Sequence, residues 1–194
     1  MSRHFFLYFI FFLSFTASFS QVKSKDRLLD SIFKLRELSN DQNIELQESL
    51  VLAERAIVLS KQYGKDSTIL KSNKNLSYLY LTNNKLIELK RINFENLRLA
   101  QALRDSLAIA NAHHILGYVY DREVKKDSAY YYYFKAVKVY KRLKDYSNSG
   151  GVLLNMANIQ MAERDFIGGE INAIDAKKLI EGLPETTITY RHYG

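Results

Sequence analysis

The sequence predicts an all-α fold built from antiparallel helix pairs that repeat along the chain. Helix-breaking residues are scarce, with one Pro and eight Gly in 194 residues. Apolar residues recur at helical spacing, and one short motif returns every 40 residues. Because 47% of the residues are apolar, the chain can bury the core of a domain of ordinary size.

Residues 1–20 have the layout of a secretory signal peptide. Arg3 and His4 come before a continuous apolar stretch, residues 5–13, which small and hydroxylated residues follow. Ser18 and Ser20 would occupy the −3 and −1 positions of a cleavage site. The apolar stretch is shorter than the ~20 residues that span a bilayer. We therefore expect export, to the periplasm or envelope of a Gram-negative cell; a retained membrane anchor is the alternative.

Three segments of the chain align without gaps and define the repeat. They cover residues 75–80, 115–120 and 155–160, so each lies 40 residues after the one before. Aspartates at similar spacing, at positions 66, 105 and 145, mark the junctions between units. Three copies in register at a fixed period predict three helical hairpins over residues 66–181.

The second unit shows the predicted elements most clearly. We expect its first helix at residues 107–123, a turn at 124–127 and its second helix at 128–143. Asp127 and Ser128 are expected to cap the second helix, since short oxygen-bearing side chains accept bonds from the free amides of a first turn.

Both ends of the chain carry weaker versions of the pattern. Residues 21–65 are expected to form a degenerate helical pair, with helices at 26–38 and 46–63 and small residues at positions 49, 53 and 56. Gly182 and Pro184 end the third hairpin. Residues 182–194 would then begin a further helix or form a tail. A helical array needs a polar capping helix, so we expect the chain to be the N-terminal part of a longer protein.

The repeat resembles the tetratricopeptide repeat (TPR), in which a small residue lets the two helices of a hairpin approach closely. The second unit matches its small and aromatic positions at Gly117, Ala129 and Tyr133, whereas the first departs from them with Leu89, Asn93 and Asn96. The resemblance implies a right-handed solenoid of antiparallel helix pairs. The usual period is ~34 residues, and we assign the extra residues to a longer second helix and the turn after it. The matched packing positions are Leu76, Ser77, Tyr80, Leu116, Gly117, Tyr120, Ala129, Tyr133, Ala136, Met156, Ala157, Gly169, Ala173 and Ala176.

In this family the first helix of each hairpin lines a concave groove. The resemblance therefore implies that a protein or peptide ligand binds there; solvated residues without a partner are the alternative. One family subtype clamps a terminal carboxylate. Lys74 fits that clamp, but the residues at 78, 115, 151 and 155 do not, so the clamp is not transferred. The groove positions are Lys71, Lys74, Tyr78, Leu81, Asn111, His114, Tyr118, Asp121, Arg122, Leu154, Asn158 and Met161.

No pattern predicts catalysis or a cofactor. The chain has no Cys, and it contains no glycine-rich phosphate loop. His113 and His114 point about 100° apart on a helix, so they cannot chelate one metal well. The net charge of +7 is scattered, without the basic stripe that nucleic-acid binding needs. The aromatic run from Tyr130 to Phe134 indicates packing, with an aromatic cage as the alternative.

These observations predict an exported protein-interaction scaffold and not an enzyme. By resemblance, it would be the recognition part of a larger membrane-associated bacterial regulator, with membrane contact only through the leader or a following segment. The alternatives are a fragment of a signalling enzyme, such as a sensor histidine kinase, or of a helix-turn-helix transcriptional regulator. A carrier of small ligands would need an enclosed apolar pocket.

Overall fold

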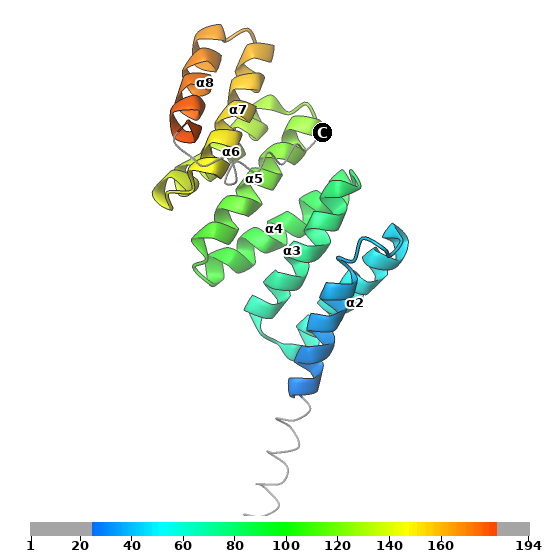
Figure 1. Ribbon diagram of the computed structural model, residues 1–194. Helices are drawn as coiled ribbons and strands as arrows, with labels where there is room; N and C mark the ends of the chain where they lie inside the picture. Colours follow the sequence, from blue (N-terminus) through cyan, green and yellow to red (C-terminus); the bar gives the residue numbers. More distant parts are fainter. Residues whose placement is uncertain (1–24, 182–194) are drawn as a thin grey trace, which may run out of the picture. The chain divides into compact units, whose positions relative to one another are not determined.

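The computed structural model describes residues 25–181, and every regular element in that range is an α-helix (Figure 1). The predicted all-α class is therefore confirmed. The leader at 1–20 and the segment 182–194 lie outside the described residues. Residues 25–38 form the first helical stretch. The helices after it are α2 (Leu46–Tyr63), α3 (Asp66–Thr82), α4 (Leu86–Ala102), α5 (Ser106–Arg122), α6 (Lys126–Arg142), α7 (Tyr146–Ala162) and α8 (Phe166–Ile180).

The chain divides into two compact units, Met1–Leu79 and Tyr80–Gly194, and the boundary falls inside α3. Within the described residues, the first unit holds the helical stretch 25–38, α2 and most of α3. The second holds α4 to α8, in which each helix packs against the next one in sequence. Successive helices of the second unit run in opposite directions, as the pairs α5/α6 and α7/α8 show (Figure 1).

The period of 40 residues comes from two identical steps of 20. Helices α3 to α7 have 17 residues each, and three residues separate each of them from the next helix. The expectation that the extra residues lengthen only the second helix and its turn is wrong. Both helices of a hairpin have the same length, and both turns have the same form.

One backbone motif makes all five of these turns. A residue with positive φ, between 53° and 64°, stands at Asn84, Arg104, Val124, Lys144 and Arg164. The amide after each of them donates to a carbonyl five residues back, as in the 2.9 Å bond from Lys125 N to Tyr120 O. This Schellman arrangement satisfies the carbonyls at the helix end. Glycine usually takes the left-handed position, but none of these five residues is glycine.

Aspartates cap three of the helices that follow these turns. Asp105, Asp145 and Asp165 accept hydrogen bonds from the amides of residues 108, 148 and 168 at 3.0–3.1 Å. The predicted cap at Asp127 and Ser128 is wrong. Helix α6 begins at Lys126, after an N-cap residue, Lys125, that offers no side-chain bond. The turn geometry sets this helix start, and it overrides the preference of the local side chains.

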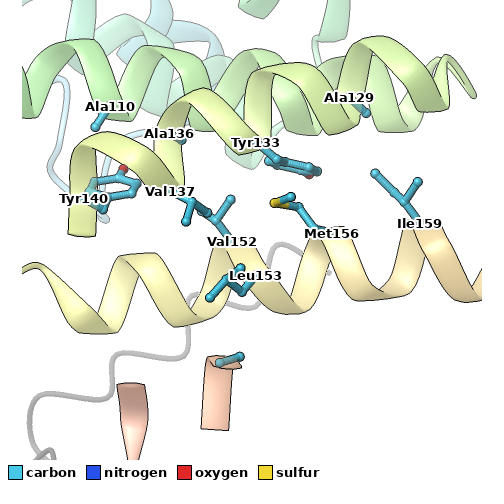
Figure 2. Packing of buried hydrophobic residues seen from close by; sticks show 11 residues of the cluster. Ala110, Ala129, Tyr133, Ala136, Val137, Tyr140, Val152, Leu153, Met156 and Ile159 are labelled. Carbon is cyan, nitrogen blue, oxygen red and sulfur yellow. The ribbon is translucent and has the colours of Figure 1, made fainter. Parts of the chain in front are cut away.

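The core of the second unit lies between α5, α6, α7 and α8, and Figure 2 shows side chains of α6 and α7 that point toward one another. Tyr133 is 1% exposed, and its ring lies against the backbone of Gly117 in α5. A Cβ at Gly117 would lie 2.9 Å from Cγ of that ring and closer still to two other ring carbons. Of the expected packing positions, all are buried except Tyr120 and Ala173, which are half-buried.

The helix in which the first hairpin departs from the family pattern packs nevertheless. Leu89, Asn93 and Asn96 of α4 are all buried, at 0%, 1% and 3% exposure. The Nδ2 of Asn93 donates to the carbonyl of Leu89 at 2.8 Å, which satisfies part of the buried amide within its own helix. Helix α4 therefore buries these positions although two of them carry amides.

Candidate functional site

Three of the expected groove residues line an open hollow in the first unit. Lys71, Lys74 and Tyr78 are exposed on α3, and Tyr78 retains 52% of its accessible surface. The hollow has a volume of about 330 Å³. Its other lining residues are Arg36, Asn40 and Asn75.

Hydrogen bonds between Asn75 and the end of the first helical stretch form the floor of this hollow. The Nδ2 of Asn75 donates to the Ser39 hydroxyl at 3.1 Å and to Asn40 Oδ1 at 3.3 Å. Asn40 Nδ2 in turn donates to Asn75 Oδ1 at 3.2 Å. These bonds join residues 35 to 36 positions apart, so they fix the end of residues 25–38 against α3.

The hollow concentrates positive charge. Within residues 25–181, none of Arg36, Lys71 and Lys74 forms an ion pair or a side-chain hydrogen bond. Arg36 is half-buried, and its Nε is buried without a partner. Burial lowers the pKa of the Arg36 guanidinium, because removal from water disfavours the charged form. An anionic ligand would relieve that cost.

In the second hairpin three of the expected groove residues, Asn111, His114 and Asp121, serve the fold instead. Asn111 Oδ1 accepts a 2.6 Å bond from the Tyr140 hydroxyl. The His114 ring packs 5.9 Å from the Tyr133 ring and 6.3 Å from the Tyr140 ring, measured between centroids. Asp121 Oδ1 accepts from Lys126 Nζ at 2.6 Å.

Three more expected groove residues differ in their accessibility. Tyr118 packs against the core cluster and is half-buried, whereas Arg122 is exposed at the end of α5. Leu81 is 8% exposed, so its placement in the groove is wrong. It follows Tyr80, a buried packing residue, and is itself held in the core.

The third hairpin again presents exposed groove residues. Leu154, Asn158 and Met161 are exposed on α7 and line a second open hollow, of about 440 Å³, between α7 and α8. The remaining lining residues are Ala157, Phe166, Gly169, Glu170 and Ala173. The hollow is mainly apolar, with an amide and a carboxylate on its lining.

A change of side-chain size between hairpins explains this second hollow. Ala173 lies 40 residues after Tyr133, and Gly169 lies 40 residues after Ala129. In the second hairpin the ring of Tyr133 fills the space against the small residue of α5. In the third hairpin no ring stands at that position, and Gly169 instead packs against Met161, whose Cγ a Cβ at Gly169 would approach to 2.9 Å.

Tyr132 of the aromatic run on α6 joins a cluster that holds a cation of the chain itself. Tyr132 stacks on Tyr120 of α5, with centroids 5.2 Å apart and ring planes 5° from parallel. Lys90 Nζ of α4 lies 4.1 Å from the centroid of Tyr120 and bonds both carboxylate oxygens of Glu123 at 3.0 and 3.1 Å. Bonds from Lys125 and Lys90 lower the pKa of Glu123. The cluster therefore braces α4, α5 and α6.

Other parts of that run differ from the prediction. Tyr133 is buried, as packing of the run predicts, but Phe134 is 51% exposed. Within residues 25–181, no group of three His, Asp or Glu side chains is placed to hold a metal ion. In the same range, no helix is long and apolar enough to cross a membrane.

The first hollow contains residues that sequence reasoning missed, Arg36 above all. Arg36 lies 40 residues before Leu76, which is a packing position, so the repeat register assigns it to the core. In the second hollow Phe166 and Glu170 were also missed, because they belong to the second helix of their hairpin. The sequence did hold one signal for Arg36, because the repeat register expects an apolar residue at this position and the chain has a charged one.

Two solved structures share the architecture of this chain. The crystal structure of BtubC (BKLC) from P. vanneervenii matches with a TM-score of 0.69 at 14% identity, over 87% of this chain and 75% of BtubC. The apo form of RapI matches with a TM-score of 0.68 at 11% identity, over 82% of this chain. The fold is that of a TPR-like helical repeat. The chain spans 56% of the length of RapI. No family model and no curated protein matches the sequence.

Proposed function

We propose that this chain is a protein-interaction scaffold that binds peptide segments of a partner at the hollows of its first and third repeats. The observation that carries the proposal is the contrast between hairpins. Asn111, His114 and Asp121 of the second hairpin bond and pack internally. In contrast, Lys71 and Lys74 in the first hairpin and Leu154 and Met161 in the third line open hollows. Exposed side chains that line an open hollow are available to a ligand.

The same geometry favours binding over the alternatives. Both hollows are open to solvent, whereas a carrier of small ligands needs an enclosed site. We propose no catalytic role, because neither hollow brings together a nucleophile, a base and an oxyanion site. We also propose that the chain is exported and serves as the recognition part of a larger membrane-associated regulator. The charged and apolar layout of residues 1–20 supports export.

Affinity capture from an envelope extract tests the scaffold proposal. With the full chain as bait, Tyr78→Ala and Met161→Ala are each expected to lower recovery of a bound partner at least ~5-fold, which corresponds to about 1 kcal/mol. Tyr131→Ala is the matched control, because Tyr131 is similarly exposed, at 53%, but lines neither hollow.

Thermal unfolding of each variant separates loss of binding from loss of fold. Equal recovery by all the variants would remove both hollows from the binding surface. The same preparation tests export, because a chain recovered from the envelope should begin at Gln21. A chain that retains Met1 and stays in the cytosol would contradict it.

A further inference from the structure

We propose that the hollow of the first unit is an anion site that binds an acidic peptide through Arg36, Lys71 and Lys74. The inference rests on the proposed scaffold function and names the chemistry of its ligand. Three cations from two helical segments line one hollow of about 330 Å³, and no acidic side chain lines it.

The Arg36 guanidinium is not needed to satisfy the carbonyls at the end of its helix. An Arg near a helix C-terminus often satisfies free carbonyls, but here other groups already do so. The Ser39 hydroxyl and Asn40 Nδ2 donate to the Arg36 carbonyl at 2.9 and 3.0 Å. Backbone amides donate to the carbonyls of residues 35, 37 and 38 at 3.0 Å. The Arg36 guanidinium is therefore left without a structural task.

The positions of the three cations and the burial of Arg36 favour a role in ligand binding over simple solvation of these side chains. Arg36 Nε is buried and has no partner among the described residues, so its hydrogen-bonding capacity is lost to the folded chain. Lys71 and Lys74 are three residues apart on α3, which puts their Cβ atoms roughly 5–6 Å apart on one face. The Asn75 bonds to residues 39 and 40 hold the two segments in this relation before any ligand arrives.

The spread of the charges favours a peptide with several carboxylates. One guanidinium pairs well with a planar carboxylate, because its donors match the two oxygens. The two ammonium groups stand on the other helix and suit further carboxylates along an extended chain. Tyr78, 52% exposed beside Lys74, offers an aromatic face to the aliphatic parts of that chain. A hollow admits side chains in a way that the flat surface of an anionic membrane does not.

Fluorescence anisotropy with the full chain tests this site. The probe is a labelled peptide of alternating Glu and Ala, and its twin has Gln at every Glu. We expect the acidic probe to bind more weakly as salt is raised, and the twin not to bind. Arg36→Gln and the double variant Lys71→Gln/Lys74→Gln should each weaken binding at least ~10-fold, since a charge-assisted hydrogen bond contributes about that factor. Lys138→Gln is the matched control, because Lys138 is exposed on α6 and lines neither hollow.

Several outcomes would overturn the proposal. They are equal binding of the Gln twin, equal weakening by Lys138→Gln, and no effect of the hollow variants. Inorganic phosphate binding in place of the peptide, or cosedimentation with anionic phosphatidylserine vesicles that requires Arg36, would assign the hollow to another ligand class. If the acidic probe fails to bind while Met161→Ala still lowers partner capture, the scaffold function stands and this site does not.

Discussion

Replacing Gly117 with leucine is expected to lower the free energy of unfolding by about 1–3 kcal/mol. A Cβ at this position would stand 2.9 Å from Cγ of Tyr133 and closer to two other carbons of the same ring. That ring is 1% exposed and cannot move toward solvent without opening the core. Either α5 and α6 separate or the ring leaves its place, and both lose packed contacts. Ala136→Leu, at a fully buried position of α6, should have an effect of the same size.

Chemical denaturation followed by circular dichroism measures this effect, and Gly151→Ala supplies the control. A Cβ at Gly151 would meet no atom within 4 Å. Because alanine favours a helix over glycine by about 1 kcal/mol, Gly151→Ala should stabilise the chain. A lower free energy of unfolding for Gly117→Leu together with a higher one for Gly151→Ala would support the packing register. Unchanged stability of both Gly117→Leu and Ala136→Leu would show that the register is wrong.

Replacing Tyr133 with alanine is expected to cost about 3–5 kcal/mol, the range for removal of a buried aromatic ring. Tyr133 is among the largest fully buried side chains of the described residues, and it belongs to the cluster that joins α5, α6, α7 and α8. Figure 2 shows its ring close to Met156 of α7. Removal would leave a cavity where two hairpins meet, so the cost includes contacts within and between hairpins.

Tyr131→Ala separates this core effect from the general loss of a helical tyrosine. Tyr131 is 53% exposed and has an edge contact with Tyr132 and a cation–π contact with Lys135. Its removal should cost less than ~1 kcal/mol. Equal losses of stability in the two variants, measured by thermal unfolding, would contradict the assignment of Tyr133 to the core.

The sequence defined the helices well, because their packing positions are periodic. The second helix of the N-terminal pair has the expected bounds, Leu46–Tyr63, and α5 begins one residue from the expected start. The turns were harder to predict. None of the five left-handed residues is glycine, and only Asn84 is of a type that favours this conformation. Val124 is a β-branched residue that disfavours it. The structure shows that these turns recur every 20 residues, which the residues at the turns do not reveal.

The candidate site was only partly predictable. The repeat register placed Lys71 and Met161 on the groove face, and the structure finds both exposed. It could not show that Asp121 pairs with Lys126, because that contact depends on where α6 begins. Nor could it assign Arg36 to a hollow, because the register places this residue in the core. Tertiary packing determines the roles of Asp121 and Arg36, and the period of the repeat alone does not predict them.

The central claim is that the fold uses Asn111, His114 and Asp121 of the second hairpin, whereas exposed groove side chains of the first and third hairpins line hollows that bind a partner. Site-specific photo-crosslinking tests it most directly, with p-benzoylphenylalanine in place of Tyr78, Met161 or, as the control, Tyr131. We expect adducts with one and the same partner from positions 78 and 161, and none from position 131. Adducts from position 131 alone, or from none of the three positions, would contradict the claim.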